Sequence, residues 1–452
     1  MNADARAERV DPVAALQELV RIPTISDREP DRIDHAAFER LHQVLRERFP
    51  LLHDRLEIVP IATHGLLLHW AGASSARPAV LMAHQDVVPV SGRWTHDPFG
   101  GEVEETADGP VVWGRGTLDD KGSLVAICAA VEGLLADGLT PAQDVWLSFG
   151  ADEEISGRCA QDAVEELRRR GVRPWFVLDE GGAVAHDAFP GIAAPVAVIG
   201  VAEKGTTSVE LTVRGDGGHS STPRRNGPTS RLARAIRRLD AASMPLSVPE
   251  PTLELMRRLA PHAPAPLRPL FTHADRLRPA LARALTRLGP EPAALVRTTI
   301  AITTLSGSPA HNVIASSATA GVNLRIMIGE SVAETAERLR RIIGDKRVLI
   351  EVTDPGEPSP VSPRDDAFAL LETCIAEVFD DAIAAPYVVL AATDSRFFHA
   401  ICDRVYRFAP FRMTAAQRRS IHAGDEHLRV ADLHAGVRYY RRLISSLPDR
   451  VP

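Results

Sequence analysis

Short apolar runs of strand length alternate with helical stretches through residues 55–180, and this alternation limits the fold more than any other feature. The clearest run, residues 79–83, is continuously apolar, as in a strand that is buried on both faces of a sheet. Residues 144–149 and 175–178 are further predicted strands, and helical segments at 118–138 and 161–170 separate the three strands. This pattern favours an α/β fold, a mixed sheet flanked by helices.

The pattern changes near Gly200. Residues 206–214, TTSVELTVR, alternate strictly between polar and apolar side chains, which indicates a strand with one solvated face. The further elements that we expect after this strand are helices at 229–239 and 332–343 and strands at 298–305, 318–328 and 347–353. Together they predict a small α+β unit.

We therefore predict a discontinuous catalytic domain with one insertion. Residues 1–200 and 357–452 would form the metal-binding catalytic domain, and residues 201–356 a smaller α+β lid or dimerisation domain. A chain of 452 residues is long enough for two cores. Residues 245–296 are long for a simple loop and contain the helical stretch LRPALARALTRL, whose role the sequence does not reveal.

Composition and charge exclude several classes of partner. A net charge of −7 gives no basis for nucleic-acid binding, and no window approaches the apolar length of a membrane span. The amino-terminal segment lacks the apolar core of a signal peptide, and the four cysteines form no CxxC pair, so buried reduced thiols are expected. We expect a cytoplasmic protein that acts on a small molecule, without nucleic-acid or membrane partners.

Acidic residues and histidines follow several of the predicted strands, where open α/β sheets place their ligand sites. His84 comes directly after the apolar run, and Asp86 lies two residues further on. The Asp86 carboxylate can reach the imidazole N–H and orient His84 as a metal ligand. An HxD motif alone is a weak signal, because a histidine at a strand end is more often not a ligand.

Two pairs of adjacent carboxylates come next. Asp119 and Asp120, in WGRGTLDDKG, fit an N-cap and a first-turn acid as well as a carboxylate that bridges two cations. Glu153 and Glu154 follow the strand that ends at residue 149. In a dry cleft they would repel each other, and a metal ion beside one would leave the other as a proton shuttle. As surface acids they need no explanation.

Asp179 and Glu180, in VLDEGG, and His422, in SIHAGDEHL, complete the set. Locally, the two acids also fit a solvated turn before two glycines, and His422 also fits an exposed loop. Each position is ordinary alone. Their joint occurrence, in this order and within these local sequences, indicates a metal site.

These segments resemble the di-zinc amidohydrolase and exopeptidase family that includes aminoacylase, carboxypeptidase S, carboxypeptidase G, acetylornithine deacetylase and succinyl-diaminopimelate desuccinylase. The resemblance extends over nearly the whole chain, and its DVVPV, LDEG and ATDSR segments are most similar to the aminoacylase and carboxypeptidase S branch. The matching segments are HQDVVPV, WTHDPF, WGRGTLDDKG, GADEE, VLDEGG, GGHSS, HNVIASSATAGVNLRI, AATDSRFF and IHAGDE.

The resemblance implies two divalent metal ions per subunit, expected to be zinc, with cobalt or manganese as alternatives. His84 would bind one ion and His422 the other, and Asp119 would bridge both. The choice between Asp179 and Glu180 stays open, because relatives differ in this turn. The implied ligands are His84, Asp119, Glu154, Asp179 or Glu180, and His422.

The resemblance also implies three catalytic roles. Asp86 would orient His84, and Glu153 would be the general base. His219, in GGHSS, would reach across the interface of a homodimer into the partner's site and help to bind the oxyanion.

Four further residues would contact or surround the substrate. Asn312 would support the scissile group, and Arg325 would pair with the substrate carboxylate through two parallel hydrogen bonds. Asp394 and Arg396 match a motif near the substrate pocket.

The implied function is metal-dependent hydrolysis of an amide bond beside a free carboxylate, in an N-acyl amino acid, a dipeptide or a C-terminal peptide bond. Two zinc ions about 3.5 Å apart can hold a bridging hydroxide, and Glu153 would take the proton of the water that forms it. The alternative is an inactive small-molecule-binding member of the same fold. The presence of Glu153 and of every expected ligand favours the enzyme.

Overall fold

The computed structural model describes residues 11–189 and 191–449 and divides the chain into two compact units. The first unit contains the residues up to Val201, Val361–Tyr387 and the residues from Thr393 onward, and the second contains Ala202–Pro360 and Val388–Ala392. The main divisions lie within a few residues of the predicted ones, but residues 388–392 were not expected to group with the second unit. The first part of the amino-terminal segment, on which the signal-peptide prediction depends, lies outside the described residues.

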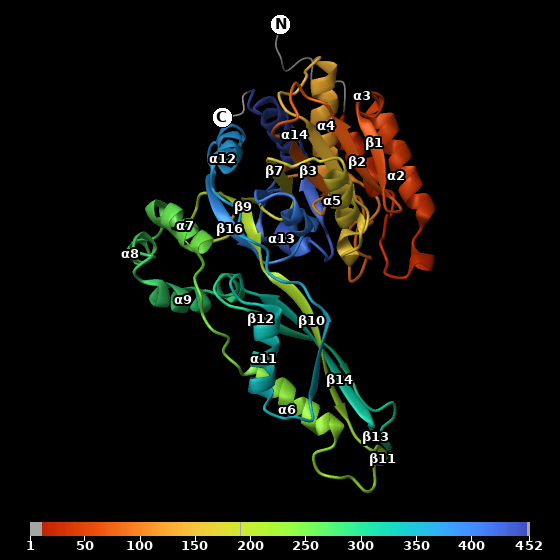
Figure 1. Ribbon diagram of the computed structural model, residues 1–452, viewed down its shortest axis with the longest axis vertical. Coiled ribbons are helices and arrows are strands. Elements are labelled where there is room, and N and C mark those ends of the chain that lie inside the picture. Colours follow the sequence, from red (N-terminus) through yellow and green to blue (C-terminus); the bar gives the residue numbers. More distant parts are fainter. Residues whose placement is uncertain (1–10, 190, 450–452) are drawn as a thin grey trace. The chain divides into compact units, whose positions relative to one another are not determined.

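The first unit is built around a ten-stranded mixed sheet (Figure 1). Its order is β1-β2-β6-β3-β7-β17-β9-β8-β18, with β16 also paired to β9. The central strands β6, β3, β7 and β17 are parallel to one another, whereas β1, β2 and β9 pair in antiparallel fashion. The strands are β1 (Glu57–Ile61), β2 (Gly65–Trp70), β3 (Ala79–His84), β6 (Val145–Gly150), β7 (Phe176–Asp179), β8 (Ala183–Ala185), β9 (Val196–Glu203), β16 (Ile383–Val389), β17 (Val405–Arg407) and β18 (Arg412–Met413).

Helices cover both faces of this sheet, which confirms the predicted α/β class. Because side chains alternate along a strand, Leu81 and Leu147 pack on one face, against the helices α1, α4, α12 and α14, and Val80 and Trp146 on the other, against α5. The helices of this unit are α1 (Pro12–Val20), α2 (His35–Arg48), α3 (Pro50–Arg55), α4 (Lys121–Ala136), α5 (Cys159–Arg169), α12 (Asp366–Val378), α13 (Ala415–Ser420) and α14 (Val430–Ser445).

A separate antiparallel sheet of three strands joins two distant parts of the first unit. Its order is β19-β5-β4, from β4 (Val103–Thr106), β5 (Gly109–Trp113) and β19 (His427–Arg429). Trp113 at the end of β5 lies opposite His427 at the start of β19. The loop that follows β5 therefore leaves, and the loop that precedes β19 enters, at the same end of this sheet.

The second unit contains a four-stranded antiparallel sheet of order β12-β14-β10-β15. Along β10 (Gly205–Arg214) buried side chains alternate with more exposed ones, as the TTSVELTVR pattern predicts. The buried face packs against α6 (Pro228–Asp240) and α11 (Val332–Ile343). The other strands are β11 (Gly218–His219), β12 (Thr299–Ser306), β13 (Val313–Ile314), β14 (Ser317–Ile326) and β15 (Leu349–Asp354).

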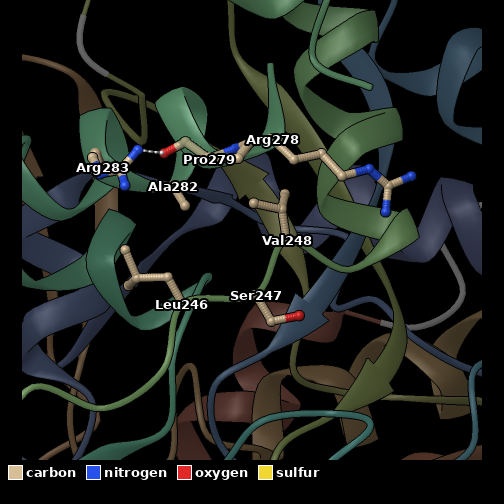
Figure 2. Close-up of a pocket in the computed structure, with 7 residues that line it drawn as sticks. All are labelled: Leu246, Ser247, Val248, Arg278, Pro279, Ala282 and Arg283. Atoms are coloured by element: carbon tan, nitrogen blue, oxygen red, sulfur yellow. Dashed lines mark hydrogen bonds between the residues drawn. The ribbon is translucent and has the colours of Figure 1, made fainter. Parts of the chain in front are cut away.

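The long segment between α6 and β12 folds into short helices and is not a loop. They are α7 (Glu250–Leu259), α8 (Arg268–Thr272), α9 (Arg278–Arg287), which lies within the predicted helical stretch, and α10 (Pro290–Ala294). Figure 2 shows a pocket beside α9, lined by Leu246, Ser247, Val248, Arg278, Pro279, Ala282 and Arg283. No acid or histidine is among these residues, so this pocket is not the predicted metal site.

Two predictions from composition are tested by the fold. The four cysteines are buried and form no disulfide bond, as expected. Among the described residues, no helix has the length and apolar character that crossing a membrane requires.

Candidate metal centre

The candidate site lies at the carboxyl ends of three neighbouring parallel strands, β6, β3 and β7. His84 is the last residue of β3, so it ends the strand and does not follow it as predicted. Glu153 and Glu154 lie in the 3₁₀ turn that follows β6, and Asp179 ends β7 directly before Glu180. Parallel pairing thus brings three distant segments to one edge of the sheet, where such folds bind ligands.

Asp119 lies between two imidazoles. His84 Nε2 is 2.9 Å from Asp119 Oδ1, and His422 Nε2 is 2.9 Å from Asp119 Oδ2. His422 Nε2 is also 3.1 Å from Glu154 Oε2. Ligand atoms of His84, Asp119 and Glu154 all lie within 4.8 Å of one another. A carboxylate that presents each oxygen to a different imidazole has the geometry of a ligand shared by two metal ions.

Asp119 and His422 reach this position from the two loops that meet beside β5 and β19. Asp119 lies in the loop after β5, directly before α4, and His422 lies in the loop before β19. Asp120 occupies the N-cap position of α4 but makes no side-chain capping bond, so the simple capping explanation of this acid pair is not supported. His422 has φ 61°, a left-handed conformation that is uncommon outside glycine and that surrounding contacts must hold.

Asp86 organises both the imidazole and the acidic turn. His84 Nδ1 is 2.9 Å from the backbone oxygen of Asp86 and 3.4 Å from its carboxylate, so both groups of Asp86 lie beside this ring nitrogen and the backbone oxygen is the nearer. The buried carboxylate accepts the backbone N–H groups of Glu153, at 3.2 Å, and Glu154, at 3.1 Å. It also accepts the hydroxyl of Ser26 at 2.7 Å, a residue with no recognisable signal in the sequence.

The two imidazoles provide positive charge within the cluster. Burial opposes protonation of His84, but Asp119 and Asp86 outweigh it and raise the pKa of His84 well above its usual range. Hydrogen bonds to Asp119 and Glu154 raise the pKa of His422 to about 10. Burial would raise the pKa of Asp119, but the two imidazoles lower it below its usual range. A divalent cation, which binds neutral imidazoles, would replace these protons.

Carboxylates outnumber these two imidazoles. Burial raises the pKa of Glu153 well above its usual range, against the opposite effect of His84. Burial raises the pKa of Asp120 in the same way, and its Oδ1 is buried with no hydrogen-bond partner in the described chain. Buried carboxylates together with imidazoles are the ligands that zinc and similar divalent cations bind in proteins, so the residues present fit such ions.

The neighbouring residues Asp179 and Glu180 have different surroundings. Asp179 Oδ2 accepts the backbone N–H of Ser395 at 2.9 Å. Burial raises the pKa of Glu180 well above its usual range, and the negative charge of Asp119 raises it further. The carboxylates of Asp179 and Glu180 therefore have different contacts: Asp179 accepts a backbone N–H group, and Glu180 is influenced by the charge of Asp119.

Asp394 and Arg396 lie in the 3₁₀ segment Asp394–Ala400 of the first unit. Asp394 is buried beside the end of β6, where a Cβ on Gly150 would lie 3.1 Å from Asp394 Oδ2. Burial raises the pKa of Asp394, Asp179 raises it further, and Arg396 has the opposite effect. Asp394 therefore joins the acidic cluster, while the Arg396 guanidinium lies 4.7 Å from the ring centre of Phe397.

The other predicted substrate residues lie in the second unit. His219 lies opposite Val313, and Ser220 N–H donates to the backbone oxygen of Asn312 at 3.1 Å, so His219 and Asn312 are close together. Arg325, whose Nη1 donates to Thr206 Oγ1 at 2.6 Å, lies at the opposite end of β14. Arg325 lies eight residues along β14, about 26 Å, from the end of this strand that leads towards His219.

A buried ion pair near Asp119 was not predicted. Arg115 Nη1 donates to Glu426 Oε2 at 2.5 Å, and both side chains are almost fully buried. Both residues lie in segments that carry the family resemblance, WGRGTLDDKG and IHAGDE, but 311 positions separate them, and no local pattern indicates that they meet.

A mixed α/β sheet with a bridging carboxylate, two imidazoles and buried acids at the ends of its parallel strands defines a metallohydrolase type of site. The chain belongs to peptidase family M20/M25/M40, whose family model matches residues 80–446. This confirms the predicted family and the predicted reaction class, hydrolysis of an amide or peptide bond.

Similar proteins cover nearly the whole chain. A probable carboxypeptidase S-like 2 of Dictyostelium discoideum is 34% identical over 95% of this chain and 84% of its own length. The N-fatty-acyl-amino acid synthase/hydrolase PM20D1 of Homo sapiens is 34% identical over 98% and 89%. The crystal structure of the M20 family metallo-carboxypeptidase Sso-CP2 from Sulfolobus solfataricus covers 96% of this chain and 98% of its own, with a TM-score of 0.68 and 18% identity. The last likeness confirms the fold.

Proposed function

We propose that this protein is a zinc-dependent amidohydrolase that removes the acyl group from N-acyl amino acids with a free carboxylate. The observation that carries the proposal is the Asp119 carboxylate, whose two oxygens each lie 2.9 Å from a different imidazole. Cobalt and manganese are the alternative metals. The similarity to PM20D1 over nearly the whole chain supports an acylated amino acid as the substrate.

The proposed site holds two ions per subunit. Asp119 would be shared by both ions, and Glu180 is our choice over Asp179 as a further ligand, because the Asp179 carboxylate accepts a backbone N–H group. His84 and His422 contact opposite oxygens of Asp119 and therefore belong to different ions, and Glu154 belongs with His422, which it contacts. The proposed ligands are His84, Asp119 and Glu180 for one ion, and His422, Asp119 and Glu154 for the other.

Glu153 is the proposed general base. When bound, the two ions polarise the amide carbonyl and lower the pKa of a water molecule. Glu153 takes a proton from the attacking water and returns it to the leaving amine, which gives a free amino acid and a carboxylic acid. Its burial suits this task, because a raised pKa makes the carboxylate a stronger base than an ordinary glutamate.

Two residues of the second unit are proposed to hold the reacting substrate. Arg325 binds its carboxylate, and His219 donates to the developing oxyanion. His219 Nδ1 accepts the backbone N–H of Ser221 at 3.1 Å, which leaves Nε2 as the ring nitrogen that can donate. Asn312, beside His219, supports the scissile group.

We propose a homodimer in which these contacts come from both subunits. About 26 Å of strand lies between Arg325 and the end of β14 nearest His219, which is longer than a short N-acyl amino acid. If both residues contact one such substrate, they belong to different chains. The second unit then serves as the lid and dimerisation domain, and the first as the catalytic domain. A cytoplasmic location stays a prediction.

Mixed dimers test this arrangement. The variants His219→Ala and Glu153→Ala are each expected to be nearly inactive, because every site lacks one necessary group. The purified mixed dimer is expected to regain up to about half of the parent's turnover, since one of its two sites again contains both groups. The measurement is kcat of the purified mixed dimer. Absence of rescue, with mixed dimers verified by differential tags, would refute the shared site.

A substrate panel tests the proposed reaction. We expect hydrolysis of N-acyl amino acids, and kcat/KM about 10–100-fold lower for their methyl esters, because ester formation removes a charge-assisted pair with Arg325 worth roughly 1.5–3 kcal/mol. The variant Arg325→Ala should lose this discrimination. Faster cleavage of dipeptides would favour a carboxypeptidase-like activity, and binding without turnover would favour the inactive alternative.

A further inference from the structure

The two loops that carry Asp119 and His422 are joined by contacts beyond the candidate metal site. Both adjoin the same end of the β19–β5 pair, where Trp113 lies opposite His427. The backbone N–H of Gly114 donates to the backbone oxygen of Glu426 at 2.9 Å, which extends the pairing by one step. The relative position of the two ligands therefore depends on what holds these loops together.

The carboxylate of Glu426 binds the loop that carries Asp119. Its Oε1 accepts three backbone N–H groups, from Leu118 at 2.8 Å and from Gly116 and Asp119 at 3.1 Å each. One of these donors is the N–H group of the bridging residue itself. The Glu426 side chain is fully buried, so water does not replace these bonds.

Arg115 binds the loop that carries His422. Its Nη1 donates to Glu426 Oε2 at 2.5 Å, and its Nη2 donates to the backbone oxygen of Ala423, the residue after His422, at 2.9 Å. The planar guanidinium spans these two acceptors, which an ammonium group cannot do. Its contact with Ala423 adjoins the left-handed backbone of His422.

We propose that Arg115 and Glu426 are positioning residues that set the distance between Asp119 and His422 before a metal ion binds, and we call the pair the Arg115–Glu426 clasp. This proposal rests on the proposed metal site. It adds that the two residues of the clasp help to determine how tightly that site binds metal ions. Neither side chain contacts the substrate or an ion in this scheme. They act through the backbone of two ligand loops.

A neighbouring ion pair provides a matched control. Arg429 Nε donates to Asp432 Oδ2 at 2.6 Å, and the Asp432 side chain is almost fully buried. This pair lies at the end of β19 and the first turn of α14, away from both ligand loops. It shares the chemistry of the clasp but not its contacts with the loops that carry the ligands.

The experiment removes both charges of each pair, since removing one partner leaves a buried charge uncompensated, whereas removing both is often tolerated. The double variants are Arg115→Met with Glu426→Gln, and Arg429→Met with Asp432→Asn. Zn²⁺ binding to the metal-free proteins is measured by competition with a chromophoric chelator, and their thermal unfolding by circular dichroism. We expect the clasp variant to bind at least one Zn²⁺ about 10–100-fold more weakly, and the control variant to bind as the parent does.

The result that would overturn the clasp is parental Zn²⁺ affinity in the clasp variant, or an equal loss in the control. A parent that binds no divalent cation would instead overturn the proposed metal site itself. If the double variant does not fold, Arg115→Lys keeps the charge but cannot span Glu426 and Ala423 together. The Arg115→Lys variant is also expected to bind Zn²⁺ more weakly than the parent. Unchanged Zn²⁺ affinity in this variant would count against the clasp.

Discussion

Replacing Glu153 with alanine is expected to lower kcat about 10²–10⁴-fold while the protein keeps its metal content. Glu154 contacts His422 at 3.1 Å and is assigned to the metal, which leaves Glu153 to transfer protons. Burial raises the pKa of Glu153, and the nearby charge of Asp394 raises it further. A base with such a pKa becomes protonated at a higher pH than an ordinary glutamate, so activity should fall as the pH drops through that raised value.

The measurement combines steady-state kinetics with metal analysis of the same sample. Glu165→Ala, which removes an exposed acid from α5, is the control and should retain parental kcat. Glu153→Gln should be as impaired as Glu153→Ala, because an amide fills the space but cannot accept the proton. Turnover close to that of the parent in either Glu153 variant, with both ions bound, is incompatible with the role of base.

Most of the fold could be predicted because its elements carry strong local patterns. The helix α11 has the predicted bounds, Val332–Ile343. Helix α11 is marked by a complete capping box at Ser331 and Glu334 and ends at a left-handed Gly344. The continuous apolar run of β3 is buried along its whole length, as a central parallel strand must be.

The short strands in the carboxyl-terminal part of the chain were harder to predict. Strands β17, β18 and β19 have only two or three residues each, too few for a periodic pattern to emerge. Their pairing is decided by partners far along the chain, such as β7 for β17 and β5 for β19. Local sequence therefore assigned residues 357–452 to the catalytic domain but did not indicate how these strands join the sheets.

The residues of the candidate site differ in the same way: some could be located from local sequence patterns, and others depend on contacts with distant parts of the chain. His84, Glu153 and Asp179 could be located because they end or follow recognisable strands, and parallel pairing then brings them together. Ser26 and Glu426 could not, since each acts through a contact with a distant loop: Ser26 with Asp86, and Glu426 with the backbone of the Asp119 loop. Residue type alone does not distinguish such a serine or glutamate from an exposed one.

Removal of divalent cations is expected to abolish turnover, and addition of Zn²⁺ or Co²⁺ to restore it. The physical reason is the composition of the site: the buried Asp120 and the partly buried Asp119, Glu153 and Glu180 accompany the two imidazoles, and two cations would neutralise the excess negative charge. The measurement is kcat after dialysis against a chelator, with metal content verified, and then during titration with each metal. The double variant of the control pair, Arg429→Met with Asp432→Asn, should lose and regain turnover as the parent does.

Recovery of activity should also depend on pH in a defined direction. In the metal-free protein, hydrogen bonds to Asp119 and Glu154 raise the pKa of His422 to about 10, so this imidazole is protonated at neutral pH. Because a metal ion binds the neutral imidazole, binding must release that proton, and Zn²⁺ affinity should rise as the pH increases from 6 towards 9. His422→Ala should bind one ion fewer and lose much of this pH dependence. Two results would contradict the metal centre: full turnover in a verified metal-free sample, or an affinity for Zn²⁺ that falls with increasing pH. Either would show that Asp119 and the two imidazoles form a structural ion-pair network.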